Sequence, residues 1–284
     1  MAGLLHLPSG GVLHLPAAEA AAAPPVLFLH GVGGGAWSFG PQRAALEPDF
    51  ACYAWEGRGH GAARRVEDAG LADYHRDAQE ALAEVHAAAK APVLLVGHSM
   101  GSLLALALAC EQPSAVRGLF LVDPVYAEQG DPPQVLTGLT LRLTRWVVGV
   151  LARSYRRDGW LSRALSGLVF RQAFSDSQAR RRAWQAQRTQ VPLEYPRMLF
   201  EAFEGVTGFP FRPFADELTA PTCVVEAAAE GRPSRFAALK ARLERRLGPA
   251  FTFHSVRGGH YLQLDRPAEV SERLVRFAAG LGGA

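Results

Sequence analysis

The hydrophobic positions of this chain form short uninterrupted runs, separated by longer segments with helical spacing. The uninterrupted runs cover residues 26–29, 93–96 and 119–122. Such runs are typical of strands that are buried on both faces of a sheet. Residues 72–89 have apolar side chains at helical intervals, and residues 103–110 are also predicted to be helical. Strands that alternate with helices pair in parallel through right-handed crossovers, which predicts an α/β fold.

The alternation extends toward both ends of the chain. Two short β-like segments, residues 4–8 and 11–16, flank a Ser-Gly pair that suits a tight hairpin turn. The pattern also predicts strands at residues 50–55, 223–225 and 251–256, and helices at residues 235–247 and 267–281. We therefore predict a mostly parallel sheet covered by helices.

The pattern is interrupted between about residues 126 and 215, where no convincing strand is found. This region contains helical segments rich in arginine and aromatic residues, broken by glycine and proline. An all-helical insertion between two strands of a parallel sheet lies at the strand ends, where ligand crevices form. We predict an α/β core made of residues 1–125 and 216–284, with residues 126–215 forming a helical lid that contributes to specificity.

Composition and charge indicate an ordinary globular protein. The chain has 284 residues, of which 49% are hydrophobic and 20% charged, and this excludes disordered, collagen-like and coiled-coil proteins. The net charge of +3 is too small to indicate a nucleic-acid partner. The cysteines are odd in number and widely spaced, which predicts buried free thiols in a reducing compartment: Cys52, Cys110 and Cys223.

The sequence predicts a cytoplasmic protein without stable membrane insertion. No stretch reaches the ~18 apolar residues that a membrane span requires. The first residues have neither a basic region nor a continuous apolar region of the kind found in secretory signals. The oligomeric state is left open by the sequence.

The strongest chemical signal is the pentapeptide GHSMG at residues 97–101. It follows the apolar run 93–96 and opens the predicted helix 103–110. In a G-x-S-x-G pattern the serine lies on a sharp strand-to-helix turn, where larger residues in place of the glycines would clash. The turn exposes the Ser99 hydroxyl as a nucleophile. It also leaves the Met100 amide at a helix start, where it can stabilise an oxyanion.

Two further loops contain candidate site residues. The glycine-rich segment 30–37 follows the apolar run 26–29, and its Val32 amide is the expected second oxyanion donor. Near the C-terminus, His260 follows two glycines and the predicted strand 251–256. A serine turn followed late in the chain by a histidine matches the residue order of α/β-hydrolase triads, so His260 is the candidate general base.

The glycine-rich segment 30–37 also allows a competing hypothesis, a dinucleotide-binding site. Such sites have a G-x-G-x-x-A pattern after a strand and an acidic residue about 20 positions further on. A serine turn has no role in a dinucleotide site, and the glycine turn at residues 57–61 is not needed there, so we favour the hydrolytic hypothesis. The residues that fit the dinucleotide pattern are Gly31, Gly33, Ala36 and Glu56.

Four segments together resemble the α/β-hydrolase superfamily: residues 30–31 (HG), 56–61 (EGRGHG), 97–101 (GHSMG) and 258–260 (GGH). The resemblance covers nearly the whole chain outside the predicted lid. It implies the fold and the catalytic class of that superfamily. The ending HYLQLD followed by RP, at residues 260–267, resembles the serine-hydrolase-like esterase branch.

The third triad member departs from the usual family pattern. Family members commonly have an aspartate in the loop after the strand that follows the lid, but residues 224–231 contain none, and Glu230 stands at the matching position. The alternative is Asp123, at the end of the predicted strand 119–122, and small esterases that this chain resembles take their acid from that place. We favour Asp123 because aspartate is shorter and stiffer than glutamate and because Pro124 restricts the local turn, and Glu230 remains open.

These residues predict a serine hydrolase that cleaves a small-molecule carboxylic ester through an acyl-enzyme, with no cofactor or metal implied. Ser99 would attack the carbonyl carbon, and His260 would move the proton. The serine disfavours epoxide hydrolases and dehalogenases, which use an aspartate nucleophile. Thioesterase, lactonase, carbon–carbon hydrolase and perhydrolase chemistry use the same triad and stay open, as does a non-catalytic receptor that binds a small ligand.

Overall fold

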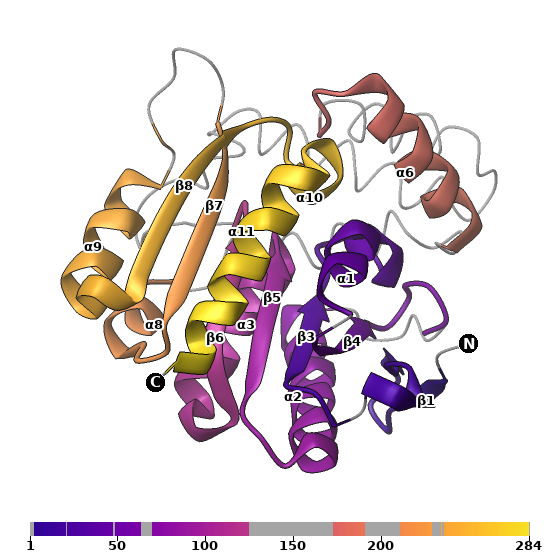
Figure 1. Ribbon diagram of the computed structural model, residues 1–284. Coiled ribbons are helices and arrows are strands. Elements are labelled where there is room, and N and C mark those ends of the chain that lie inside the picture. The colour runs from indigo at the N-terminus through magenta and orange to yellow at the C-terminus, as the bar shows by residue number, and fades with distance from the viewer. Residues whose placement is uncertain are drawn as a thin grey trace.

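The computed structural model contains an eight-stranded sheet with helices on both of its faces (Figure 1). The strand order is β1-β2-β4-β3-β5-β6-β7-β8. β1 and β2 run antiparallel to their neighbours, and the pairs from β4 to β8 are parallel. The sheet confirms the predicted α/β fold. The structure describes residues 3–20, 22–47, 49–63, 70–124, 173–190, 211–228, 234 and 236–283.

Each predicted strand is present, and the apolar runs mark the strand centres. β6 begins at Val116, before the apolar run 119–122, because Arg117 and Gly118 separate Val116 from that run. The strands are β1 (Leu4–His6), β2 (Val12–His14), β3 (Pro25–Leu29), β4 (Ala51–Glu56), β5 (Val93–His98), β6 (Val116–Val122), β7 (Thr222–Ala228) and β8 (Phe251–Arg257).

The helices agree with the predictions except where they are short. The sequence pattern does not predict α1, which has seven residues, or α10, which has four. The helices are α1 (Gly40–Leu46), α2 (Leu71–Ala89), α3 (Met100–Glu111), α6 (Ser177–Gln190), α8 (Phe211–Glu217), α9 (Ala237–Leu247), α10 (Leu262–Asp265) and α11 (Pro267–Gly280).

The side chains of the central strands alternate between two hydrophobic clusters, one on each face of the sheet. In β5, Val93 and Leu95 join the cluster that contains residues of α2, α3 and α9. Leu94 and Val96 join the cluster that contains residues of α1 and α11, and α11 crosses in front of the sheet in Figure 1. Because both faces are covered by helices, the centres of these strands are apolar at successive positions, as the uninterrupted runs predict.

Most of the predicted lid lies outside the described residues, so its extent stays a prediction. Within residues 126–215, the structure describes 173–190 and 211–215. These residues are helical or connecting, and they contain no strand. In α8, Ala215 is buried in the same core cluster as residues of α3 and α9. The apolar segments 146–151 and 199–200, which the sequence suggests as pocket walls, lie outside the described residues.

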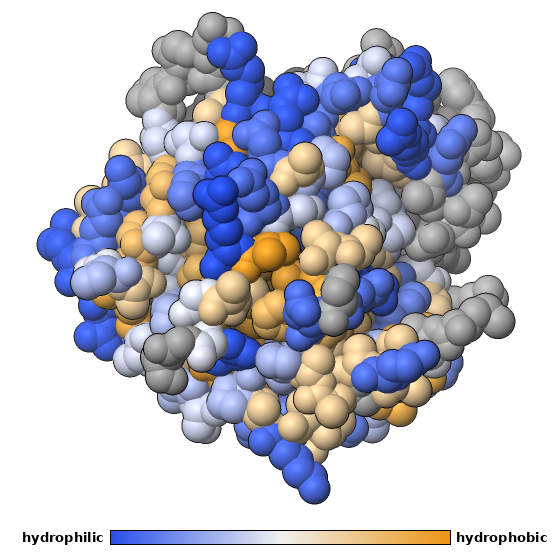
Figure 2. Space-filling model, in the orientation of Figure 1, coloured by the Kyte–Doolittle hydropathy of each residue, from blue (hydrophilic) through white to orange (hydrophobic). Residues whose placement is uncertain are grey.

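The surface of α6 is strongly polar. Hydrophilic side chains gather over the described first half of this helix in Figure 2, and Arg181 and Arg182 are exposed. None of the described helices is both long and apolar enough to span a membrane. The three cysteines are free thiols, as predicted; Cys52 and Cys223 are buried, whereas Cys110, also predicted to be buried, is only half-buried.

Candidate active site

Ser99 lies on the sharp turn between β5 and α3. Its backbone has φ 51° and ψ −117°, and this left-handed region of φ is strained for a residue with a side chain. A Cβ at Gly97 would lie 2.5 Å from the Gly101 carbonyl oxygen, and a Cβ at Gly101 would overlap the Leu29 carbonyl oxygen. The two glycines of the pentapeptide are therefore required because backbone atoms approach them closely.

The structure brings Ser99, His260 and Asp123 into one hydrogen-bonded row. His260 Nε2 lies 2.9 Å from Ser99 Oγ, and His260 Nδ1 lies 2.5 Å from Asp123 Oδ2. The carboxylate can only accept, so Nδ1 carries a proton and Nε2 is free to accept from the serine hydroxyl. Glu230, the other candidate acid, lies outside the described residues.

Asp123 is held from two sides at the end of β6. Its side chain is fully buried, and its second oxygen, Oδ1, accepts the Ala227 amide at 2.9 Å. Its own amide donates to the Val225 carbonyl oxygen at 2.8 Å. These contacts with β7 direct Oδ2 toward the imidazole, an orientation that a triad acid needs.

The two predicted oxyanion donors belong to segments next to Ser99. Met100 is the first residue of α3, so its amide has no acceptor within the helix. In the glycine-rich loop, a Cβ at Gly31 would lie 2.8 Å from the Ser99 Cβ, so this loop passes close to the serine. The Gly33 amide donates to His60 Nε2 at 3.0 Å and is already used. These contacts leave the Val32 amide as the loop's candidate donor beside Ser99.

The comparisons with known proteins identify the family. The model of the alpha/beta hydrolase family matches residues 26–273 of this chain. The chain belongs to the alpha/beta hydrolase family. The resemblance inferred from the four sequence segments is confirmed by this match.

Individual relatives are similar over part of the sequence or in fold. "Putative carbamate hydrolase RutD" of Klebsiella pneumoniae (strain 342) is 40% identical over 105 residues, which are 36% of this chain and 38% of that protein. The chain thus matches well under half the length of this relative. The enol-lactonase from Burkholderia xenovorans LB400 has a TM-score of 0.73 at 18% identity, covering 98% of this chain and 100% of that one. A thermophilic esterase from Thermogutta terrifontis has a TM-score of 0.74 at 18% identity, covering 99% of each chain. These two structures share the fold of this α/β hydrolase.

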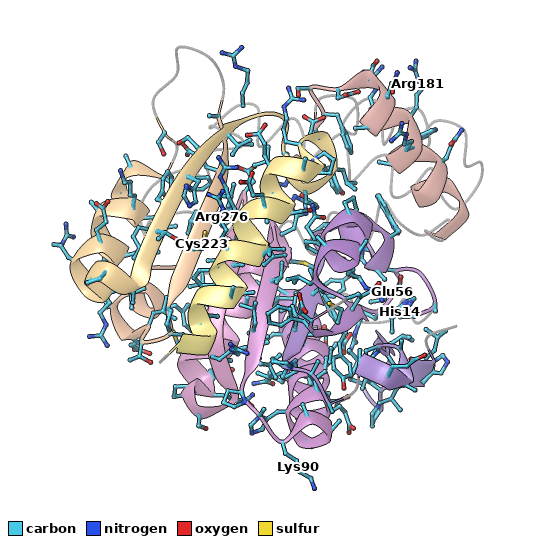
Figure 3. The ribbon with its side chains drawn as sticks, viewed as in Figure 1. His14, Glu56, Lys90, Arg181, Cys223 and Arg276 are labelled. Carbon is cyan, nitrogen blue, oxygen red and sulfur yellow. The ribbon has the colours of Figure 1, made fainter. Side chains whose placement is uncertain are left out.

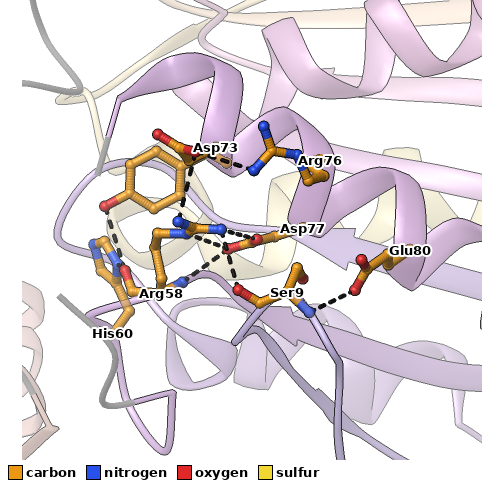
Figure 4. Close-up of polar contacts among 8 residues, drawn as sticks. Ser9, Arg58, His60, Asp73, Arg76, Asp77 and Glu80 are labelled. Carbon is orange, nitrogen blue, oxygen red and sulfur yellow. Dashed lines mark hydrogen bonds and ion pairs between the residues drawn. The ribbon is translucent and has the colours of Figure 1, made fainter. Parts of the chain in front are cut away.

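A buried ion pair supports the glycine-rich loop of this α/β hydrolase (Figure 4). Arg58 Nη2 lies 2.7 Å from Asp77 Oδ1, and Arg58 Nε lies 3.0 Å from Asp77 Oδ2. The Arg58 carbonyl oxygen accepts from His60 Nδ1 at 3.1 Å and from the Tyr74 hydroxyl at 3.3 Å. With its proton on Nδ1, His60 can accept the Gly33 amide at Nε2. The ion pair therefore positions the histidine that orients the loop.

Glu56, the acid of the dinucleotide hypothesis, is used within the protein. Its carboxylate is buried and accepts the amides of Ala36 at 3.2 Å and Ala62 at 2.8 Å. His14 Nε2 lies 3.0 Å from the same carboxylate (Figure 3). Burial raises the pKa of Glu56, but the contacts with His14 and the two amides outweigh it and lower the pKa to about 2. Glu56 thus joins the two glycine turns instead of facing a ribose.

In the described part of the chain, no group of three or more metal-ligating side chains comes together.

Two buried histidines are expected to make the fold sensitive to acid. Burial and, to a smaller extent, a neighbouring histidine together lower the pKa of His60 and of His98 from 6.5 to about 3; the neighbour is His30 for His60 and His260 for His98. The stability that these lowered pKa values imply is present above about pH 6.5 and is lost as the pH falls toward 3. Between pH 6 and pH 4, the free energy of unfolding should fall by about 1.4 kcal/mol per pH unit for each histidine. Urea unfolding at a series of pH values measures this slope.

A His60→Asn variant is the control for the acid prediction. Because it removes one of these buried histidines, its slope between pH 6 and pH 4 should be smaller than that of the wild type by about 1.4 kcal/mol per pH unit. A wild-type free energy of unfolding that stays constant over this range would contradict the prediction.

Sequence reasoning missed the residues that hold His260 in place. His98 Nε2 donates to the His260 carbonyl oxygen at 2.9 Å, and the two rings are 4.8 Å apart. Tyr261 also packs against His98, with ring centroids 4.8 Å apart. Position 98 is a free position in the G-x-S-x-G pattern, so the sequence carries no signal for this role. Only the fold brings β5 beside the loop that follows β8.

Proposed function

We propose that this protein is a serine hydrolase that cleaves small-molecule carboxylic esters through an acyl-enzyme intermediate. The observation that carries the proposal is the hydrogen-bonded row of Ser99, His260 and Asp123 at the end of the sheet. The row has a nucleophile, a base within hydrogen-bond reach and a buried acid that orients the base, which are the parts that acyl transfer needs.

In the first half of the reaction, Ser99 Oγ attacks the ester carbonyl carbon. His260 Nε2 takes the hydroxyl proton as the Oγ–C bond forms, and the imidazolium is stabilised by the Asp123 carboxylate. The amides of Val32 and Met100 donate to the oxyanion, a contribution of about 3 kcal/mol for each donor. When the tetrahedral intermediate collapses, the C–O bond to the alcohol breaks and His260 gives its proton to the leaving alkoxide.

In the second half, a water molecule replaces the alcohol. His260 Nε2 takes a proton from the water as its oxygen attacks the acyl carbon, and the new oxyanion is held by the same two amides. Collapse breaks the bond between the acyl carbon and Ser99 Oγ, which regains its proton from His260. The products are a carboxylic acid and the free enzyme.

We further propose that residues 126–215 form a lid over the acyl site, with residues 1–125 and 216–284 forming the core. The described part of this region supports a location near the site, because the Ala173 carbonyl oxygen accepts the Tyr261 amide at 3.1 Å. Tyr261 directly follows His260. The lid would then supply part of the pocket that selects the acyl or alcohol group.

Carbamate or lactone hydrolysis is the second candidate function. A relative is named as a carbamate hydrolase and a structural neighbour as an enol-lactonase. Both substrates have a carbonyl carbon that Ser99 could attack with the same donors. A carbamate differs from a simple ester in the nitrogen bonded to its carbonyl carbon, and a lactone differs because the leaving oxygen stays tethered to the acyl group.

A fluorophosphonate probe and a substrate panel test the proposed function. We expect the probe to bond to Ser99 alone and p-nitrophenyl acyl esters to be hydrolysed over many turnovers, because the row activates this hydroxyl. A Ser271→Ala variant, altered on α11 away from the row, should label as fully as the wild type. Peptide mapping by mass spectrometry locates the label. Labelling at another serine would contradict the proposal, a label without multiple turnovers of any ester would favour a receptor, and faster turnover of carbamates or lactones would favour the second candidate.

A further inference from the structure

Asp265, at the end of α10, accepts an unusual number of hydrogen bonds for one buried carboxylate. Its side chain is 4% exposed. The oxygen Oδ2 accepts three donors and Oδ1 accepts one. These are the Ser175 amide at 2.8 Å, the Ser175 hydroxyl at 2.6 Å and the Gly259 amide at 2.7 Å on Oδ2, and the Asp176 amide at 2.8 Å on Oδ1.

The donors come from two segments that are far apart in the sequence. Gly259 directly precedes His260, whereas Ser175 and Asp176 directly precede α6. The two segments lie in backbone contact, because a Cβ at Gly259 would overlap the Ala173 carbonyl oxygen. Asp265 therefore joins the His260 loop to the chain that leads into α6.

Tyr261 forms a second connection between the same segments. Its amide donates to the Ala173 carbonyl oxygen at 3.1 Å. Its ring stacks on Phe174, with centroids 5.1 Å apart and planes 3° apart. Its hydroxyl donates to the Val32 carbonyl oxygen at 3.1 Å. The His260 loop is thus tied at once to the segment before α6 and to the loop of the candidate oxyanion donor.

We propose that Asp265 is a positioning residue that locks the His260 loop to residues 173–176, so that the imidazole stays aligned with Ser99. This proposal rests on the proposed function and deepens it. We call Asp265 and its partners Ser175, Asp176 and Gly259 the Asp265 clamp. The clamp makes the placement of the general base depend on the chain that begins α6.

A carboxylate is required at this position because it can only accept. An asparagine has one amide nitrogen, which would face either the Asp176 amide or the three donors on Oδ2. In the first orientation, the Asp176 amide would face the asparagine NH₂ group and lose its acceptor. In the second orientation, the three donors on Oδ2 would lose theirs. In Asp265→Ala, and in the asparagine orientation that turns the NH₂ group toward the Oδ2 donors, the Gly259 amide loses its acceptor and its backbone is free to shift. A misplacement of about 1 Å in a catalytic group can lower kcat about 10²-fold.

Steady-state kinetics of Asp265→Asn and Asp265→Ala test the positioning role. The concentration of active sites is titrated with a fluorophosphonate, and kcat is expressed per titrated site. We expect the kcat of the Asp265 variants to decrease by roughly 10- to 100-fold and their KM to stay within about threefold of the wild type. Leu243→Ala, which opens the core under α9, is the control for lost stability and should keep the wild-type kcat per titrated site. A double-mutant cycle with Ser175→Ala should be non-additive, since both residues belong to one clamp. A kcat for the Asp265 variants equal to that of Leu243→Ala would overturn the proposal.

Hydrogen exchange tests the clamp without relying on activity. In Asp265→Ala, the amides of Ser175, Asp176 and Gly259 lose their acceptor, so exchange should accelerate in peptides from both segments. Leu243→Ala should leave these peptides at the wild-type rate. Faster exchange in only one segment, or in neither, would overturn the proposal. A wild-type protein that turns over no ester would contradict the proposed function, whereas the exchange result would still decide whether the clamp joins the two segments.

Discussion

Replacing Ser99 by alanine is expected to lower kcat for ester hydrolysis by a factor of about 10⁶. Alanine cannot form the acyl-enzyme, so the only remaining route is direct attack by water on a substrate held by the oxyanion donors. That route retains a residual acceleration of about 10³ to 10⁴ over water. Initial rates with p-nitrophenyl esters, measured at enzyme concentrations high enough to detect the residual rate, give both numbers.

The fold should be unaffected by this change, which makes the result interpretable. The strain at position 99 comes from its positive φ of 51°, and serine and alanine both carry a Cβ, so the strain is the same in each. Urea unfolding should therefore give a similar free energy for the wild type and Ser99→Ala. A Ser99→Ala protein that keeps its kcat within tenfold of the wild type would refute the proposed nucleophile.

A further variant separates the serine from the base. Because the three residues of the row act as a unit, Ser99→Ala combined with His260→Ala should be about as slow as Ser99→Ala alone. If the double variant were slower by another large factor, His260 would have to assist catalysis by a route that does not involve the serine.

The fold could be predicted because its strands are buried on both faces. In β3 and β5, every residue is apolar apart from the ends. This pattern can be recognised in the sequence without knowing which strands and helices pack against them. The hydrophobic pattern does not predict helices that are short. α10 has only four residues, too few for a helical pattern of apolar side chains, and its last residue is Asp265 of the clamp. Length, not composition, separates the helices that the sequence predicts from those that it does not.

The candidate site could be predicted in part for a related reason. Ser99 and His260 are flanked by glycines, and these glycines can be recognised in the sequence although some of the backbone atoms that require them, at Leu29 and Ala173, are distant in it. The residues that hold them are not marked locally, because Asp265 meets Ser175 across 90 positions of the chain. Neither the number of histidines, which is nine, nor the spacing of the acidic residues distinguishes Asp265 from a surface carboxylate. Positioning residues of this kind emerge only from the packed structure.

The choice between the two candidate acids rests on geometry that the sequence could not supply. Asp123 lies 2.5 Å from His260 Nδ1, and its left-handed φ of 39° turns the chain at the end of β6. The contacts of its amide and Oδ1 with β7 hold the side chain in this direction. We therefore base the second large prediction on Asp123.

Replacing Asp123 by asparagine is expected to lower kcat about 10⁴-fold. The Ala227 amide donates to Oδ1 at 2.9 Å, so the asparagine oxygen will take that place and its NH₂ group will face His260 Nδ1. Nδ1 must then accept, which moves the imidazole proton to Nε2. An imidazole with its proton on Nε2 donates to Ser99 Oγ and cannot take the hydroxyl proton, so the base is lost while the fold is kept.

Glu230→Gln is the matched control, because it makes the same chemical change at the other candidate acid. We expect its kcat to stay within about threefold of the wild type, since the row of Ser99, His260 and Asp123 already supplies an acid to the imidazole. Both variants are assayed from pH 6 to pH 10, because hydroxide can partly replace the missing base and should raise the rate of Asp123→Asn at high pH. The opposite pattern, near wild-type turnover in Asp123→Asn and a loss of several orders of magnitude in Glu230→Gln, would mean that the buried aspartate braces β6 and that the acid comes from the segment after β7.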